Sequence, residues 1–307
     1  MPRRVTLLAG GVGGAKMAHG FQQVLQPGEL TVIVNVADDF ELWGLHISPD
    51  LDTVMYTLAG LADPRTGWGI AGDTHAALEM LERLGAPTWL SIGDRDLATH
   101  VRRTQLLRDG ISLTDATDAL RTALGVPSTI LPATDHRVRT MVRTDAGELD
   151  FQTYFVARGQ RDEVRDVRFD GIAAAEPTAA VLAAIRGADL VVLAPSNPIV
   201  SIGPVLQLPG VRAAVAAGRS IAISPIVAGR ALKGPADRML VSLGHEATAR
   251  GVARLYAGLV DAFVLDETDA ALTADVEALG MRAVVLPTVM RSDADRARLA
   301  QALLADR

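Results

Sequence analysis

Short apolar runs alternate with longer amphipathic stretches along most of the chain. Runs of valine, leucine and isoleucine, such as those at 5–9 and 189–194, predict strands that are buried on both faces. Between such runs, apolar residues recur every three or four positions, as at 73–85, which predicts helices with one buried side. This alternation predicts an α/β fold, in which a doubly wound, Rossmann-like parallel sheet of about six strands carries helices on both faces. Further strands are predicted at 30–36, 89–92, 221–224, 262–265 and 282–286, and a last helix from 293.

The pattern changes between residues 128 and 170, where polar and apolar residues alternate. Such alternation predicts strands with one exposed face, here at 138–142, 149–156 and 163–169, and Asp145-Ala146-Gly147 predicts a hairpin turn. We therefore expect a Rossmann-like nucleotide-binding body, residues 1–127 and 171–307, that carries a smaller β-containing insertion, residues 128–170.

The first predicted strand leads into a glycine-rich turn, Gly10-Gly11-Val12-Gly13-Gly14-Ala15-Lys16, and a helical pattern follows. Glycines let the backbone approach a bound group closely, and amides at a helix N-terminus attract phosphate. The spacing is not that of a dinucleotide fingerprint, because Lys16 stands at the sixth position, nor that of a Walker P-loop, because Met17 follows the lysine. Two interpretations stay open: a site for nucleotide phosphates, or a tight turn that lets the helix pack against the strand.

Four carboxylates gather near the end of the strand predicted at 30–36. Asp38 and Asp39 follow the strand directly, a loop with Trp43 and His46 comes next, and Asp50 and Asp52 open a helix. One carboxylate would be enough to cap that helix. Because the carboxyl ends of parallel strands form the ligand edge of an open sheet, the set is expected at that edge.

Three later segments also offer polar groups. His100, Arg103 and Thr104 are three and four residues apart, so they share one helix face, which either holds a polar ligand or is a solvated face. The strand at 189–194 ends in Pro195-Ser196-Asn197-Pro198, which is either a ligand contact or a plain strand-to-helix turn. The segment 225–235 places Lys233 and an arginine beside glycines, which suits phosphate contact.

Composition narrows the class of protein. Hydrophobic residues make up 49% of the chain and aromatic residues only 4%, so the predicted core is aliphatic. A net charge of −6 gives no basis for general nucleic-acid binding. Without cysteine, disulfides, thiolate metal sites and a cysteine nucleophile are excluded. No apolar run reaches membrane-spanning length and no signal-peptide core opens the chain, so we expect a cytoplasmic protein without a membrane partner.

Several of these stretches, in this order, resemble one family of enzymes. The stretches are 10–16, Asn35-Val36-Ala37-Asp38-Asp39, Pro49-Asp50-Leu51-Asp52-Thr53, Gly93-Asp94-Arg95-Asp96-Leu97-Ala98-Thr99-His100, 195–198 and Ser224-Pro225-Ile226-Val227. The set resembles the 2-phospho-L-lactate transferase and phosphoenolpyruvate transferase family of coenzyme F-420 biosynthesis, from about residue 5 to residue 240.

The resemblance implies a reaction between small-molecule substrates. The donor would be a guanosine diphosphate (GDP) ester of 2-phospholactate or phosphoenolpyruvate, and the acceptor the deazaflavin Fo, whose terminal hydroxyl attacks phosphorus so that GMP leaves. The resemblance also implies Mg²⁺ as cofactor and is compatible with a homodimer. Such a displacement needs a neutralised diphosphate and a nucleophile held in line.

The resemblance also assigns residues to roles. The donor phosphates and nucleotide would be bound by Gly10, Gly11, Gly13, Gly14, Lys16, Ser196, Asn197 and Pro198. The acceptor would be bound by Asp52, Ser91, His100, Arg103 and Thr104. Mg²⁺ prefers oxygen ligands, which Asp38, Asp39, Asp50 and Asp52 could supply. Asp52 is the first candidate for the metal, helped by Asp38 or Asp39. Alternatively, it would be catalytic by orienting the hydroxyl or taking its proton. Many relatives carry a basic residue where this chain has Ser91, so either a nearby arginine such as Arg95 substitutes for it or acceptor binding differs in detail.

Two other functions compete with this one. A regulatory protein of the same fold would bind a nucleotide sugar through a similar glycine turn without catalysing a reaction. A nicotinamide-dependent dehydrogenase would place Asp38 on the ribose, but the glycine spacing argues against it.

Overall fold

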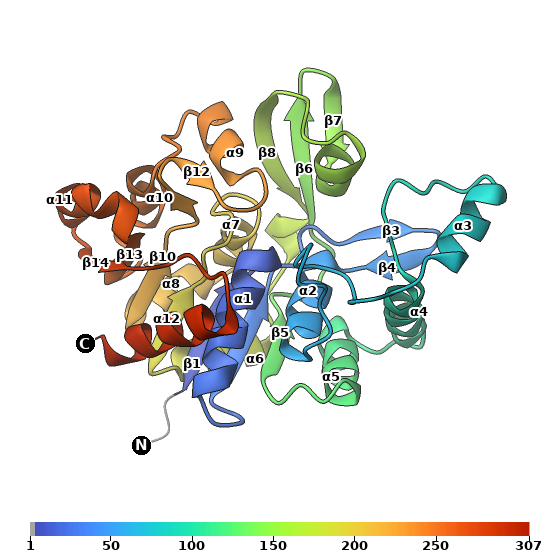
Figure 1. Ribbon diagram of the computed structural model, residues 1–307, viewed down its shortest axis with the longest axis horizontal. Coiled ribbons are helices and arrows are strands. Elements are labelled where there is room, and N and C mark those ends of the chain that lie inside the picture. Colours follow the sequence, from blue (N-terminus) through green and yellow to red (C-terminus); the bar gives the residue numbers. More distant parts are fainter. Residues whose placement is uncertain (1–3, 307) are drawn as a thin grey trace.

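A parallel sheet forms the centre of this computed structural model, which describes residues 4–306 (Figure 1). Within that range the sheet has seven strands in the order β14-β13-β10-β9-β1-β2-β5. Their bounds are β1 Val5–Ala9, β2 Leu30–Val34, β5 Thr129–Pro132, β9 Leu190–Leu193, β10 Ser220–Ile223, β13 Ala262–Asp266 and β14 Arg282–Leu286. The chain builds outward from β1 to β5 on one side and from β9 to β14 on the other. Such a reversal leaves a crevice at the carboxyl ends of the two central strands, β1 and β9.

Helices cover both faces of the sheet, because the inner strands are apolar on both sides. Leu7 of β1 packs in one apolar cluster and its neighbour Leu8 packs in the other. The first cluster includes α1 Gly11–Val24, α2 Pro49–Leu58, α5 Leu113–Ala123 and α12 Asp293–Ala305. The second includes α6 Ala179–Arg186, α7 Ile202–Gln207, α8 Val211–Ala217, α10 Ala249–Tyr256 and α11 Thr273–Glu277. The predicted fold class, a doubly wound parallel sheet, is confirmed.

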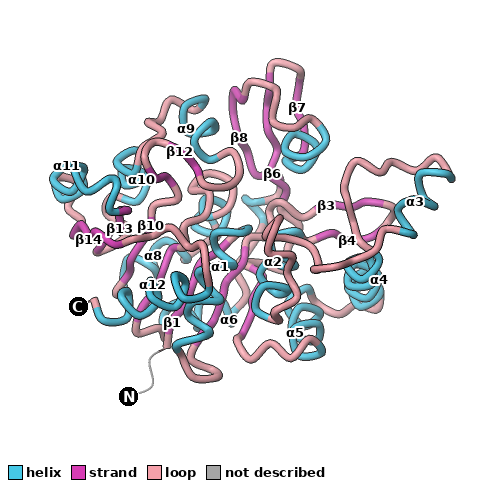
Figure 2. Tube along the Cα trace, in the orientation of Figure 1, coloured by secondary structure: helices cyan, strands magenta, loops and turns pink. Residues whose placement is uncertain are grey.

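A lateral module extends from the sheet between β2 and β5, at the right of Figure 1. It contains the hairpin β3 Phe40–Leu42 and β4 Leu45–Ile47, and the helices α3 Ala76–Arg83 and α4 Asp94–Arg108. The hairpin lies in a stretch for which the sequence predicts a loop. The strand predicted at 89–92 is wrong: those residues are not in a strand, and Ile92 instead packs against the hairpin in a separate apolar cluster. The chain between α2 and α3 runs mainly as loop (Figure 2).

A three-stranded antiparallel sheet projects from the top of the molecule in Figure 1. It consists of β6 Arg139–Thr144, β7 Gly147–Asp150 and β8 Val164–Asp170, whereas β5 belongs to the central sheet. The strand predicted at 149–156 is wrong beyond Asp150, where a helical turn, Thr153–Ala157, follows. The cause is local, because the Asp150 carboxylate accepts hydrogen bonds from the Thr153 amide and hydroxyl, at 2.9 and 2.6 Å.

The second half of the chain adds a small hairpin near the crevice. Its strands are β11 Ile226–Val227 and β12 Arg230–Ala231, and α9 Ala236–Ser242 follows. Across residues 4–306, none of the helices combines the length and the apolar character needed to cross a membrane.

Candidate active site

The glycine turn lies at the carboxyl end of β1, and α1 begins inside it, at Gly11. Two of its glycines allow close packing. A Cβ atom on Gly13 would lie 2.3 Å from the Pro195 carbonyl oxygen, and one on Gly14 would lie 2.7 Å from the Cβ of Ala9. Both distances are far inside van der Waals contact, so α1 can sit this close to β1 and to the loop after β9 only with glycine here.

The other two glycines face polar side chains. A Cβ atom on Gly10 would lie 2.6 Å from the Cβ of Ser201 and 2.8 Å from the Oδ2 atom of Asp50. Gly11 has a φ of +56°, and the same test places its Cβ 3.4 Å from Asp50 Oδ1. The Asp50 carboxylate therefore lies at the N-terminus of α1, where the helix dipole and free amides favour an anion.

The loop after β9 is hydrogen-bonded to the glycine turn. The Ser196 hydroxyl accepts a hydrogen bond from the Gly10 amide at 3.1 Å and donates one to the Gly10 carbonyl at 2.6 Å. Asn197 Oδ1 accepts from the Ile199 amide at 2.9 Å, which shapes the loop around the buried Pro198. Ser196, Asn197 and Pro198 are thus brought beside the glycine turn, although their sequence positions are distant.

Asp38 and Asp50 form a close pair of like charges. The Asn35 amide donates one hydrogen bond to Asp38 Oδ2 at 3.1 Å and another to Asp50 Oδ2 at 3.0 Å. Burial, and then the charge of Asp50, raise the pKa of Asp38 well above its ordinary value. Burial raises the pKa of Asp50 to about 6, with hydrogen bonds from Asn35 and the Gly11 amide opposing the shift. Like carboxylates held this close favour a proton or a cation between them.

Asp39 lies next to this pair. It accepts hydrogen bonds from the Ser48 hydroxyl, at 2.8 Å, and faces His46 Nε2, at 3.0 Å. Within residues 4–306, two buried oxygens lack a hydrogen-bond partner here: Asp38 Oδ1 and Asp39 Oδ1. A buried carboxylate oxygen without a donor is costly, and a divalent cation would satisfy it. The oxygens of Asp38, Asp39 and Asp50 are thus of the kind that a hard metal ion prefers, but within residues 4–306 the group whose ligand atoms already lie close enough to share one ion is Asp52, Asp96 and His100.

Asp52 lies in a different, buried network that reaches α4. Both Nη atoms of Arg103 donate to its carboxylate, one of them at 3.0 Å. Burial opposes the charge of Arg103, but the Asp52 carboxylate more than compensates, so the pKa of Arg103 is raised. His100 lies between two acids, with Nδ1 3.5 Å from Asp52 and Nε2 3.3 Å from Asp96. The hydroxyl of Tyr56 donates to Asp96 at 2.8 Å.

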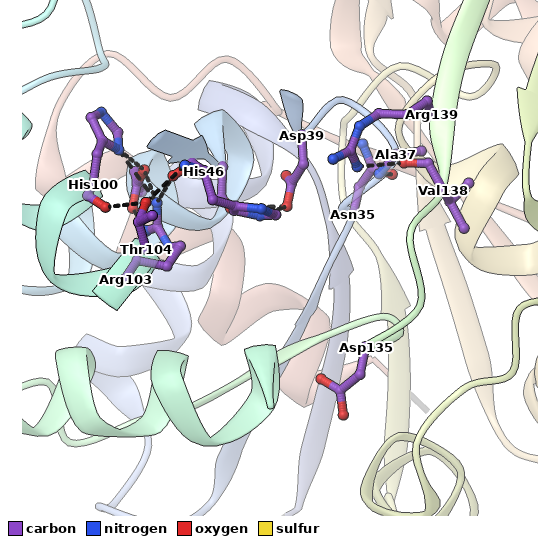
Figure 3. A network of polar contacts seen from close by, with 12 residues as sticks. Asn35, Ala37, Asp39, His46, His100, Arg103, Thr104, Asp135, Val138 and Arg139 are labelled. Carbon is purple, nitrogen blue, oxygen red and sulfur yellow. Dashed lines mark hydrogen bonds and ion pairs between the residues drawn. The ribbon is translucent and has the colours of Figure 1, made fainter. Parts of the chain in front are cut away.

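The predicted helix face of His100, Arg103 and Thr104 is therefore turned inward, not toward solvent (Figure 3). Thr104 donates to the His100 carbonyl at 2.7 Å and accepts from the His46 amide at 2.8 Å, which joins α4 to β4. The group Asp52, Asp96 and His100 could hold a metal ion. Arg103, however, already engages both oxygens of Asp52, so an ion there would have to compete with a buried guanidinium.

A cavity of about 180 Å³ opens on the other side of Asp96. Its lining includes Trp68, Ile70, His75, Ser91 and Asp96. The Ser91 hydroxyl lies 3.2 Å from His75 Nε2, so an imidazole ring lies beside Ser91, where the family resemblance leads us to expect a basic side chain. Arg95 does not fill that role, because its Nη2 atom donates to the Gly72 carbonyl at 2.6 Å and supports the loop beneath.

The sequence did not single out Trp68, His75 or Asp96 as site residues. Asp96 lies within the stretch 93–100 that carries the family resemblance, so a signal existed for it. Trp68 and His75 lie in a glycine-rich loop without periodicity, and only the tertiary structure brings them to the cavity.

Lys16 reaches the loop that follows β14. Its ammonium donates to the Met290 carbonyl at 3.0 Å. Burial, Arg296 and Lys233 all lower its pKa.

Comparisons with known proteins agree over almost the whole chain. The profile of the family described as "2-phospho-L-lactate transferase CofD" matches residues 5–297. The chain is 39% identical over 302 residues to a 2-phospho-L-lactate transferase from Methanothermobacter thermautotrophicus, which covers 98% of this chain and 97% of that protein. It is 42% identical over 309 residues to a phosphoenolpyruvate transferase from Streptomyces griseus, with 98% and 97% covered.

Among solved structures, a protein of the upf0052 family from Bacillus halodurans has a TM-score of 0.65, covers 99% of both chains and is 16% identical. At that identity the likeness supports the fold alone. The family assignment rests on the profile and on the sequence relatives, both of which span the glycine turn, the acid pair and the cavity. The chain therefore belongs to the 2-phospho-L-lactate transferase CofD family.

Proposed function

We propose that this protein transfers a 2-phospholactyl or phosphoenolpyruvyl group from a GDP ester to the deazaflavin Fo in coenzyme F-420 biosynthesis. The observation that carries the proposal is the Asp38–Asn35–Asp50 cluster, which lies against the N-terminus of α1 at the crevice of the sheet. The N-terminus of α1 favours an anion and the carboxylates beside it favour a cation, so together they suit a metal-bound diphosphate. Family membership supplies the class of reaction.

The donor would bind at the glycine turn. Its phosphates would lie beside Gly10 and take the place of the Asp50 carboxylate at the Gly11 amide, and its guanosine would lie along Ser196, Asn197 and Pro198. Asp38, Asp39 and Asp50 would hold Mg²⁺, which supplies charge neutralisation for the diphosphate. In this proposal Gly13 and Gly14 shape the site without touching the ligand, because their α-carbons face Pro195 and Ala9.

The acceptor would bind in the cavity beside Asp96. Trp68 offers an aromatic surface for a flat deazaflavin ring, and Ser91 and His75 offer hydrogen bonds. The terminal hydroxyl would extend toward Asp52, which accepts its proton as the new oxygen–phosphorus bond forms and the bond to GMP breaks. His100, Arg103 and Thr104 would act through Asp52 and Asp96, because their polar atoms contact those acids or the backbone.

The decisive experiment combines the purified protein, Fo, Mg²⁺ and each of the two GDP esters in turn. We expect GMP release together with a product whose mass equals Fo plus the phospho-acid minus one water, and in excess chelator neither GMP nor this product. The preferred ester identifies the acid that is transferred. Binding of a nucleotide sugar without any turnover would instead support the regulatory function, and the proposal would be abandoned.

A further inference from the structure

The chain has two lysines, Lys16 and Lys233, and the fold brings both to one place although 217 positions separate them (233 − 16). Burial lowers the pKa of Lys16 most, and the neighbouring charges of Arg296 and then Lys233 lower it further. Among residues 4–306, neither ammonium is ion-paired with a carboxylate. Each donates only to a main-chain carbonyl: Lys16 to Met290 at 3.0 Å and Lys233 to Thr66 at 3.3 Å.

A continuous set of contacts joins the two lysines across the start of α1. Lys233 holds Thr66, and the adjacent Gly67 packs on Val12, since a Cβ on Gly67 would lie 2.8 Å from Val12 Cγ1. Val12 lies one helical turn before Lys16, on the same side of α1. The loop between β12 and α9, which carries Lys233, therefore reaches over the first turn of α1 to the loop that lines the cavity.

Two cations held together without a counter-charge repel each other, and an anion between them removes that repulsion. This arrangement is the reverse of the acid pair, where two carboxylates lack a cation. The acid pair and the lysine pair both flank the first turns of α1. A ligand with several negative charges and a bound metal ion would neutralise both.

We propose that Lys16 and Lys233 together bind the diphosphate of the nucleotide, with Lys233 closing over it from the second half of the chain. The inference deepens the proposed function and rests on it for the identity of the nucleotide. It assigns a binding role to Lys233, to which the family resemblance gave none. It also means that residues from both halves of the chain contact the same ligand.

The test measures binding of GDP, guanosine and inorganic pyrophosphate to the full chain by calorimetry with Mg²⁺ present. Lys16→Met and Lys233→Met are each expected to weaken GDP and pyrophosphate binding about 10- to 100-fold, the size of a lost charge-assisted hydrogen bond, and to leave guanosine binding unchanged. Lys233→Arg is expected to restore most of the affinity. Thermal unfolding of the free variants should not occur earlier, because each substitution relieves a repulsion.

Arg238→Gln is the matched control. Arg238 lies five residues from Lys233, is also exposed, and donates to the Gln160 carbonyl at 3.2 Å, so its loss removes the same charge and a similar contact. The control should bind GDP like the wild type. If Lys233→Met binds GDP within twofold of the wild type, or if Arg238→Gln weakens it equally, the two-lysine site is refuted. Absence of product from the wild-type protein, with lysine-dependent pyrophosphate binding retained, would refute the proposed reaction and leave the two-lysine site standing.

Discussion

At the scale of single residues, the site is defined by groups that burial makes unfavourable in the free protein. Asp50 has a pKa of about 6 in the fold against an ordinary value of 3.8. A carboxyl with a raised native pKa binds its proton more tightly when folded, so its stabilising effect is complete below about pH 4 and is lost as the pH rises through about 6. Asp38, whose pKa is also raised, acts in the same direction.

The first prediction concerns this pair and Mg²⁺. At pH 7.5 the Asp50 carboxyl, with a pKa of about 6, is mostly deprotonated, so Mg²⁺ should raise the thermal unfolding midpoint; at pH 5 a proton competes for this carboxyl and the increase should be much smaller. Asp50→Asn should stabilise the metal-free protein at pH 7.5 by about 1–3 kcal/mol and abolish the Mg²⁺ effect. Asp118→Asn replaces an exposed acid on α5 and should leave the Mg²⁺ effect on thermal unfolding unchanged. An equal Mg²⁺ shift at both pH values would contradict a metal bound by these acids.

The second prediction concerns Asp52 and Arg103, both buried. Asp52→Asn leaves a buried guanidinium without its counter-charge, so we expect it to lower the free energy of unfolding by about 3–5 kcal/mol and to abolish transfer. The double variant Asp52→Asn/Arg103→Met should recover much of the stability but no activity. Urea unfolding measures the first effect and GMP release the second. Wild-type turnover by folded Asp52→Asn would remove Asp52 from the chemistry.

At the scale of elements, α1 explains why the glycine turn admits two interpretations. The packing role falls on Gly13 and Gly14, which face the backbone of neighbouring elements. Gly10 and Gly11 face Asp50. In our proposal a ligand takes over the Gly11 amide, because the Gly10 amide already donates to Ser196. Sequence alone does not separate these roles, because which side of α1 packs against β9 depends on the strand order.

The third prediction follows from that packing. Gly13→Ala places a methyl group against the Pro195 carbonyl, so α1 must shift; we expect a loss of about 1–3 kcal/mol in stability and weaker GDP binding. Gly218→Ala is the control, because its added methyl group would meet an ordinary contact at 3.9 Å. The control should change stability by less than about 0.5 kcal/mol. Equal effects of the two substitutions, measured by urea unfolding, would show that the close approach of α1 is not the cause.

Other elements show where local pattern is insufficient. The hairpin β3–β4 turns at Trp43 and Gly44, whose φ values are +53° and +73°. Such turns are usually signalled by Asn-Gly or Asp-Gly, and a tryptophan at the first position hides the signal. The long buried strands and the last helix were predictable because their apolar runs are continuous and strong.

At the scale of the whole molecule, the doubly wound sheet was predictable from alternation alone, and it accounts for the gathering of Asp38, Asp50 and Ser196 at one edge. The cavity was not predictable, since its lining comes from a loop without periodicity, and its position depends on how the lateral module packs. The inward orientation of His100 and Arg103 likewise depends on α4 meeting α2 through Asp52 and Asp96.

The cavity and the proposed nucleotide site are built from separate parts of the chain, which has a consequence for how the acceptor preference of this enzyme could be changed. Everything that surrounds the cavity comes from residues 63–96, in one excursion between two neighbouring strands, whereas the proposed nucleotide contacts come from elsewhere. A chimera that takes residues 63–93 from a relative with another acceptor should therefore acquire that relative's acceptor preference while its affinity for GDP stays within about threefold, or about 0.7 kcal/mol, of the parent. Competition assays with both acceptors would measure the change in acceptor preference. Acceptor selectivity could then be transferred between relatives by exchanging one continuous segment of the chain, without changing recognition of the nucleotide.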